Sequence, residues 1–206
     1  MNGMPASSRL RLLCHAATSA VRASAFPADE PIDSQGLQKL AALSFRASAA
    51  DRCWSSPALR ARQTAQGLKF AATIEPMLRD CDYGRWAGRS FDEVQAEEPD
   101  ALAEWLRDPA SAPHGGESIV NLMRRVASWL DAQNGAPGRT VAVTHASVIR
   151  AAVVHAIGAP PQSFWRIDVA PLSLTRLSGA NGRWTLASIG RLEGKHSLDD
   201  VGEAEA

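Results

Sequence analysis

This chain lacks the features that mark several classes of protein. Its 22 lysines and arginines equal its 22 aspartates and glutamates, so no overall basic field predicts a nucleic-acid or membrane partner. No stretch approaches the roughly 18 apolar residues of a membrane span, and the opening residues MNGMPASSRLRLL hold no apolar core of signal-peptide length. We therefore expect a cytoplasmic protein that contacts neither nucleic acid nor a membrane.

Cysteines are few as well. Cys14, Cys53 and Cys81 form an odd set without the spacing of a metal site. Such a set is typical of reduced thiols in the cytoplasm.

The composition that is present is ordinary for one soluble domain. The chain has 206 residues, 45% of them hydrophobic and 21% charged, which is enough to bury a sizeable core. Strand-like and helix-like segments alternate, which predicts a three-layer α/β/α sandwich with a mainly parallel sheet and an antiparallel edge. We expect residues 1–192 to form a single domain and residues 193–206 a polar, poorly ordered tail.

The apolar periodicity places the individual elements. Strands are expected at 9–14, 52–55, 74–79, 140–145, 164–168, 173–178 and 183–189, and helices at 34–43, 56–69, 90–98, 99–107, 117–132 and 147–157. The helix at 34–43 has Ser34 as its expected N-cap and turns Leu37, Leu40 and Leu43 to the core. A loop broken by prolines is expected over 16–33.

Two histidines each follow an apolar, strand-like run. His145 ends the run 140–145 and is followed at once by a helix-like stretch, while His15 ends the first strand and precedes small residues. Open α/β sheets bind ligands at the carboxyl ends of their strands, and helix starts favour anions. Either histidine alone is more often structural, but the two together predict one phosphate pocket, where a histidine can form a covalent phosphoryl intermediate.

Arginines follow another predicted strand. Arg60 and Arg62 lie where the stretch Ser55–Ala65 passes from strand to helix. A guanidinium binds two phosphate oxygens at once, which a lysine cannot do. Arg60 is therefore a candidate phosphate ligand, whereas Arg62 fits a solvated helix face.

Five short motifs occur in the order of a known family. They are Cys14–Ala16, Ser55–Thr64, Asp80–Gly88, Gly115–Ser118 and Thr144–Arg150. In them the sequence resembles the histidine phosphatase superfamily, also called phosphoglycerate mutase-like, over roughly residues 9–190. One such motif is weak, but five in order are specific.

The resemblance implies a role for each matching residue. His15 accepts the phosphoryl group, and Arg60 and His145 bind it and stabilise its charge. Asp80 stands where most members carry the glutamate that protonates the leaving oxygen; because it is one methylene shorter, Asp82 is a second candidate. Phosphoryl transfer depends on positioning and electrostatic stabilisation, so neither metal nor cofactor is expected, and the partner is a small phosphorylated molecule.

The chain also departs from the family's motifs. Cys14 replaces an arginine, and losing one such preorganised donor typically costs on the order of 10²–10³ in rate. Ala16, Ala146 and Ser147 replace glycines but still supply amide N–H groups, so Ala146 is a candidate phosphate ligand. Arg22 is a candidate substitute for the missing cation, and a surface charge is an equally good interpretation of it.

Other reactive residues are weaker candidates. Cysteine phosphatases use Cys-x5-Arg, but the sixth residue after Cys14 is Ala20, so Cys14 is not expected to be the nucleophile. His114 could line the substrate side of the pocket, although an exposed loop position fits it somewhat better, and His155 is expected to be structural.

These observations favour a metal-independent phosphomonoesterase that acts through a phosphohistidine on a small metabolite. A hydrolase is favoured over a mutase because the segment between Gly88 and His114 is short for a closing lid. The alternative is a catalytically impaired or inactive member, a pseudoenzyme that binds a phosphorylated ligand or a protein partner, and the loss of the motif arginine supports it. A homodimer is simply the commonest assembly.

Overall fold

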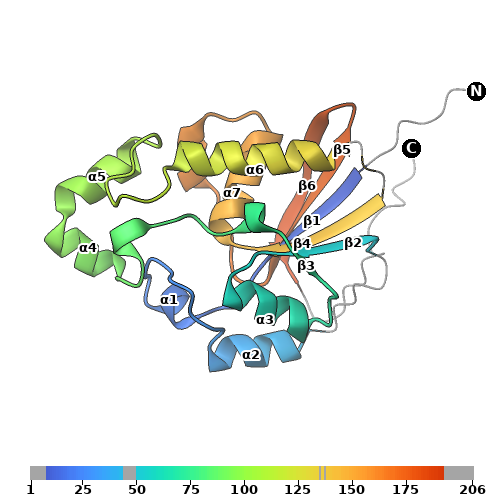
Figure 1. Ribbon diagram of the computed structural model, residues 1–206, viewed down its shortest axis with the longest axis horizontal. Coiled ribbons are helices and arrows are strands. Elements are labelled where there is room, and N and C mark those ends of the chain that lie inside the picture. The colour runs from blue at the N-terminus through green and yellow to red at the C-terminus, as the bar shows by residue number, and fades with distance from the viewer. Residues whose placement is uncertain (1–7, 44–49, 135, 137, 193–206) are drawn as a thin grey trace, which may run out of the picture.

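The protein is built on a six-stranded sheet with the order β3-β2-β4-β1-β5-β6 (Figure 1). The computed structural model describes residues 8–43, 50–134, 136 and 138–192. The strands are β1 (Ser8–Cys14), β2 (Arg52–Ser55), β3 (Thr73–Ile74), β4 (Gly138–Thr144), β5 (Ser173–Ala180) and β6 (Arg183–Arg191). The first four in chain order pair in parallel, and β5 and β6 add an antiparallel edge beside β1. The predicted mixed sheet is confirmed.

Helices cover both faces of the sheet. Helices α6 (Ile119–Gln133) and α7 (Ala146–Ala156) lie on one face, and α2 (Ser34–Ala41) and α3 (Leu59–Gly67) lie on the other (Figure 1). Successive side chains of a strand point to opposite faces. Leu12 of β1 accordingly packs in the core under α6 and α7, and Leu13 packs in the core under α2 and α3. This arrangement is the predicted three-layer sandwich.

Three further helices lie beyond the carboxyl ends of the parallel strands. They are α1 (Ser19–Arg22), α4 (Phe91–Glu97) and α5 (Pro99–Arg107) (Figure 1). Ser90 begins α4 with a capping box, because its hydroxyl accepts from Glu93 N while the Glu93 carboxylate accepts from Ser90 N. The segment between Gly88 and His114 therefore builds two helices at the end of the sheet where ligands bind in such folds.

Two predicted strands are wrong in whole or in part. No strand forms over 164–168: residues 164–166 belong to the 3₁₀ helix η3 (Pro161–Arg166), and 167–168 follow it. Pro161 suits the first turn of a helix and cannot donate to a sheet. The segment 74–79 is split between β3 and the 3₁₀ helix η1 (Pro76–Leu78), and Pro76 again ends the pairing.

Several helix boundaries also differ from the predictions. The loop 16–33 contains α1, whose N-cap is Thr18. The helix at 34–43 is capped by Asp33 rather than Ser34, and its Leu37 is 50% exposed instead of buried. Helix α3 begins only at Leu59, so the expected start at 56–57 is too early.

The predicted tail, 193–206, lies outside the described residues, and the division into one domain and a tail stays a prediction. None of the helices in the described part of the chain is both long and apolar enough to cross a membrane. The three cysteines are free thiols.

Candidate active site

Three neighbouring parallel strands deliver polar side chains to one edge of the sheet. In the register of the sheet, Cys14 pairs with Thr144, and Ser55 pairs with Val143. The next residues, His15, Ser56 and His145, therefore emerge together. The rings of the two histidines lie edge to face, with their centroids 5.1 Å apart. The two strand-end histidines share one site, as the sequence predicted.

The ring of His15 is held in one tautomer. Its Nδ1 lies 2.8 Å from the carbonyl oxygen of Ala16, and because a carbonyl can only accept, Nδ1 carries the proton. Burial lowers the pKa of His15, so the ring is neutral and Nε2 keeps a free lone pair. An imidazole in this state can act as a nucleophile through Nε2.

Arg60 lies beside the histidines in the first turn of α3 and is only 2% exposed. Its Nη2 donates to Asp80 Oδ2 over 2.6 Å, and its Nη1 donates to Ala28 O over 2.6 Å. The carboxylate of Glu30 lies 3.8 Å away. The Arg60 Nε is buried and forms no hydrogen bond within the described part of the chain.

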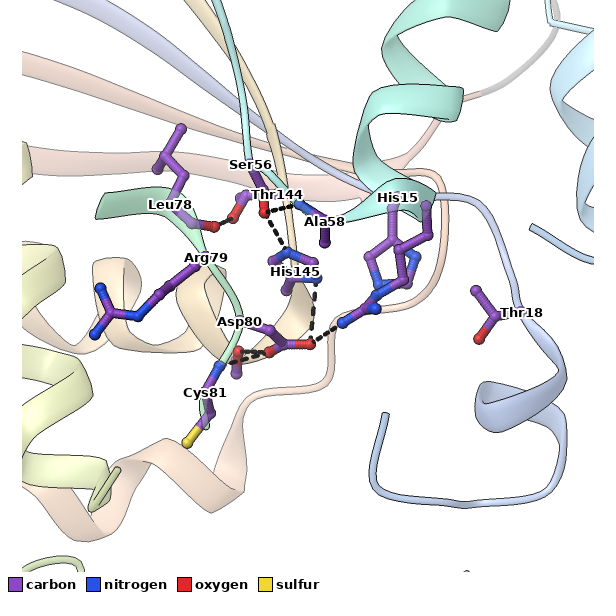
Figure 2. A network of polar contacts seen from close by, with 12 residues as sticks. His15, Thr18, Ser56, Ala58, Leu78, Arg79, Asp80, Cys81, Thr144 and His145 are labelled. Atoms are coloured by element: carbon purple, nitrogen blue, oxygen red, sulfur yellow. Dashed lines mark hydrogen bonds and ion pairs between the residues drawn. The ribbon is translucent and has the colours of Figure 1, made fainter. Parts of the chain in front are cut away.

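Asp80 occupies the centre of this polar network (Figure 2). Besides Arg60, its carboxylate accepts hydrogen bonds from the Ser147 hydroxyl and from Cys81 N, the latter over 2.9 Å. Burial alone would raise the pKa of Asp80. The neighbouring His145 and Arg60 and the Ser147 hydroxyl outweigh that effect and hold this pKa below its ordinary range. Asp80 is therefore an ionised internal anion in this structure.

His145 faces Asp80 from the start of α7 (Figure 2). Its Nε2 lies 2.7 Å from the Ser56 hydroxyl oxygen. Its Nδ1 lies 3.2 Å from Asp80 Oδ2 but forms no hydrogen bond with any described residue. Burial lowers the pKa of His145 to about 3, so this ring is neutral as well.

Comparison with known proteins identifies the family of this chain. The profile of the histidine phosphatase superfamily, branch 1, matches residues 10–191. This chain belongs to that superfamily.

Curated relatives match parts of the chain, and some of them are named as phosphatases. The chain is 33% identical over 128 residues to a bifunctional protein of Mycobacterium tuberculosis, covering 58% of this chain and 35% of the relative. It is 32% identical over 121 residues to glucosyl-3-phosphoglycerate phosphatase of Mycolicibacterium vanbaalenii, covering 52% of this chain and 53% of the relative. The chain thus spans about a third to a half of the length of these curated relatives.

A solved structure shows the shared fold. Phosphoserine phosphatase from Entamoeba histolytica, in complex with 3-phosphoglyceric acid, superposes with a TM-score of 0.80 over 91% of this chain and 98% of that chain. The two sequences are 18% identical.

Cys14, which the resemblance matches to an arginine, is buried in the structure. It is 2% exposed, and burial raises the pKa of its thiol to about 12. The amide of Ala16 donates to Thr64 Oγ1 over 3.0 Å. One of the amides that the sequence offered to a phosphate is thus already engaged. The role of Ala146 as a phosphate ligand stays a prediction.

The two acidic candidates lie in different surroundings. Asp80 contacts both Arg60 and His145, whereas Asp82 is exposed and its Oδ1 accepts from Gly84 N over 2.9 Å in the following turn. Of the two carboxylates, Asp80 is the one that faces the histidines.

Three other candidates lie apart from this network. Arg22 is 39% exposed and is paired with Asp33, so it is engaged at the surface rather than with Asp80; its phosphate-binding role stays a prediction. His114 is buried, with Nδ1 accepting from Gly116 N and its ring 5.0 Å from that of Trp86, which corrects the exposed loop position. His155 is half-buried and paired with Asp131.

Sequence reasoning missed four residues that contact this network. Ser56 and Ser147 supply hydroxyls to His145 and Asp80, and Arg125 and Glu117 form a buried pair behind Asp80. Ser147 was considered only for its amide, and its hydroxyl was detectable because it stands at a motif glycine two residues after His145. Within the described ranges, no group of three or more His, Cys, Asp or Glu side chains is arranged to hold a metal ion.

Proposed function

We propose that this chain hydrolyses a phosphomonoester of a small metabolite through a phosphohistidine at His15. The observation that carries the proposal is the ring of His15. Its Nδ1 proton is donated to Ala16 O, which leaves the lone pair of Nε2 for attack on phosphorus, and the ring lies 5.1 Å from that of His145. The membership of the superfamily supports the same chemistry.

Substrate binding requires an exchange of anions. Asp80 now holds the Nη2 of Arg60 and lies beside His145 Nδ1. The phosphoryl group takes this place and recruits two buried nitrogens, Arg60 Nε and His145 Nδ1, that have no hydrogen-bond partner among the described residues. Unpaired buried donors carry a cost of about 1–3 kcal/mol each, which an incoming phosphate relieves.

Phosphoryl transfer then proceeds in two steps. The lone pair of His15 Nε2 attacks phosphorus, the ester P–O bond breaks, and the leaving oxygen takes a proton from Asp80. A water molecule next attacks phosphorus and gives a proton back to Asp80, while the P–N bond breaks and its electron pair returns to Nε2. The sum is phosphomonoester plus water giving alcohol plus inorganic phosphate.

The proton on Asp80 arrives with the substrate. Asp80 is ionised in the free protein because Arg60 and His145 hold its pKa low. A phosphate that binds these two groups removes that stabilisation and adds negative charge, and both effects raise the pKa of the carboxyl. A phosphomonoester has a second pKa near about 6, so its monoanion can bring the proton that Asp80 needs.

The substrate class that we infer is a phosphorylated alcohol rather than an aryl or acyl phosphate. A general acid is needed most when the leaving oxygen is a poor leaving group, and Asp80 supplies one. Relatives are named for glucosyl-3-phosphoglycerate and phosphoserine, and both compounds are phosphate esters of an alcohol.

The test compares the parent chain with His15→Ala and a matched control, His155→Ala. A panel of sugar, glycerate, serine and aryl phosphates is assayed with a chelator, and phosphoenzyme is trapped by rapid quenching under alkaline conditions. We expect chelator-resistant turnover and an acid-labile phosphoenzyme in the parent and control, and neither in His15→Ala. Turnover that is indifferent to His15 contradicts the proposal.

One observation favours the alternative, a phosphate-binding member without turnover. Arg60 is surrounded by acceptors at Ala28, Glu30 and Asp80, and no arginine stands at position 14. If inorganic phosphate binds, as measured by calorimetry, while no phosphoenzyme forms with any substrate of the panel, the pseudoenzyme is the better description.

A further inference from the structure

A second buried ion pair lies directly behind Asp80. Arg125 of α6 binds Glu117 through two parallel hydrogen bonds, Nε to Oε1 over 2.9 Å and Nη2 to Oε2 over 2.6 Å. Their side chains are only 7% and 10% exposed. The same guanidinium donates to three main-chain carbonyls, those of Met77 (2.6 Å), Arg79 (3.0 Å) and Asp80 (3.3 Å).

The main-chain carbonyls of the segment that ends at Asp80 are bound by side chains. The carbonyl of Leu78 accepts from the Thr144 hydroxyl over 2.9 Å. Together with the three carbonyls held by Arg125, all four consecutive carbonyls of residues 77–80 are bound by a side chain. Because this segment lies outside the sheet, the position of Asp80 is set by these side chains rather than by a strand ladder.

Arg125 and Glu117 are themselves fixed on a rigid element. Glu117 precedes α6, and its N–H donates to the carbonyl of Asp82 over 2.7 Å. Gly116 makes this approach possible, because a Cβ there would lie 2.1 Å from that carbonyl oxygen. The start of α6 and the segment after Asp80 are thus locked together.

We propose that the Arg125–Glu117 pair positions Asp80 for proton transfer to the leaving oxygen. The inference rests on the proposed function. Asp80 is shorter than the glutamate that the superfamily resemblance implies, so its reach depends more on where its main chain lies. A misplacement of about 1 Å can cost on the order of 10²-fold in rate.

Stability alone does not explain this pair. Replacing a buried ion pair by well-packed apolar side chains is often neutral or stabilising. An apolar pair, however, could not hold the carbonyls of residues 77, 79 and 80. The five donated hydrogen bonds of Arg125 therefore point to a positioning residue, acting through Asp80 and not on the substrate.

The experiment uses the dependence of rate on the leaving group. Arg125→Lys and Glu117→Gln are compared with Arg124→Lys, a matched control at the exposed neighbour of Arg125. Each variant is assayed with glycerol phosphate, whose alkoxide needs a proton, and with p-nitrophenyl phosphate, whose phenolate does not. We expect Arg125→Lys to lower kcat for glycerol phosphate about tenfold to a hundredfold, with kcat for the aryl phosphate and both KM values within about threefold.

A double variant tests whether the effect passes through Asp80. Asp80→Asn should lose glycerol phosphate turnover selectively, and adding Arg125→Lys to it should cause no further selective loss. Equal losses on both substrates, or additive losses in the double variant, overturn the positioning role.

Two further outcomes remain informative. If Arg125→Lys does not fold, Glu117→Gln tests the same contact, because it removes the negative charge that pairs with Arg125 while keeping the side-chain volume. An inactive parent chain overturns the proposed function and the inference with it, whereas an active parent with uniform losses overturns the inference alone.

Discussion

Two buried arginine–carboxylate pairs meet at Asp80, and they differ in how completely their hydrogen bonds are satisfied. Arg125 donates from Nε, Nη1 and Nη2 to Glu117 and to main-chain carbonyls. Arg60 donates to Asp80 and Ala28 but leaves its Nε buried without a partner in the described structure. A pair whose donors are all hydrogen-bonded fixes the main chain around it. A pair with an unpaired donor can instead exchange its carboxylate partner for a ligand.

The difference also separates the parts that the two pairs play in the proposed reaction. Unsatisfied buried groups are uncommon in folded proteins and call for an explanation at each position. Arg60 Nε and His145 Nδ1 are two such groups, and both residues contact Oδ2 of Asp80. In the proposed reaction the Arg60 side of Asp80 contacts the substrate, and the Arg125 side holds the main chain.

The largest effect on rate is expected at Arg60. Arg60→Met removes the buried guanidinium that donates to Asp80, and we expect kcat/KM to fall by at least about 10²–10³-fold. Arg62→Met is the matched control, because Arg62 is exposed two residues further along α3. Steady-state kinetics with glycerol phosphate decides the point. A loss of less than about tenfold would place phosphate binding elsewhere, with Arg22 the next candidate.

The largest effect on stability is expected at Arg125. Arg125→Met leaves three carbonyls without this donor and leaves the Glu117 carboxylate with a long 3.5 Å contact to Arg79 Nη2. Breaking a buried pair in this way costs about 3–5 kcal/mol. Arg60→Met should cost less, because Asp80 keeps hydrogen bonds from Ser147 and Cys81 N. Urea denaturation measures both free energies of unfolding. Equal losses at the two arginines would remove the distinction between the pairs.

Asp80 should compete with phosphate for Arg60. Asp80→Asn removes the internal negative charge, so we expect inorganic phosphate to bind about tenfold more tightly, a gain of about 1.4 kcal/mol. Glu117→Gln changes the other pair and should leave this affinity within about twofold. Isothermal titration calorimetry with phosphate compares the two. Unchanged or weaker binding by Asp80→Asn would show that the carboxylate does not occupy the phosphate site.

The sequence was sufficient to place the two histidines and Arg60 together. Their strands are short apolar runs that end on a polar residue, and the ends of parallel strands meet at one edge by geometry alone. The 3₁₀ helix η3 was missed because Phe164 and Trp165 give it an apolar pattern that resembles a buried strand. Local periodicity does not separate these two cases in short segments.

The state of Asp80 could not be predicted from the sequence. Its partners Arg60 and Ser147 are 20 and 67 residues away along the chain, and Arg125 reaches its carbonyl from 45 residues away. The charge on the carboxylate results from the balance between its burial and these neighbours, which exists only in the folded chain.

His145, which lies with Arg60 beside Asp80, should also make the free energy of unfolding depend on pH. Burial lowers the pKa of His145 to about 3, below the ordinary value of about 6.5. As the pH falls from 6.5 towards 3, His145 becomes protonated in the unfolded chain but not in the folded chain. The free energy of unfolding therefore decreases. One such group contributes up to about 1.4 kcal/mol per pH unit.

Urea titrations at pH 4–7 measure this dependence. His145→Gln should flatten the slope of the free energy of unfolding against pH, and the half-buried control His155→Gln should not. Equal slopes in the parent and both variants would contradict the buried neutral ring.

The smallest effect is expected at Cys14, where the resemblance to the superfamily implies a second phosphate-binding arginine besides Arg60. The thiol is buried, and its pKa is raised to about 12, so no reactive thiolate forms at neutral pH. Cys14→Ser should therefore keep kcat within about threefold, and an alkylating reagent should leave this cysteine unmodified, as mass spectrometry of the treated protein can establish. Loss of activity in Cys14→Ser with the fold intact would instead give the sulfur a part in the reaction. Retained activity means that one ligand-facing arginine, with two neutral histidines and the exchangeable Asp80, suffices for the chemistry that two arginines share in the superfamily pattern.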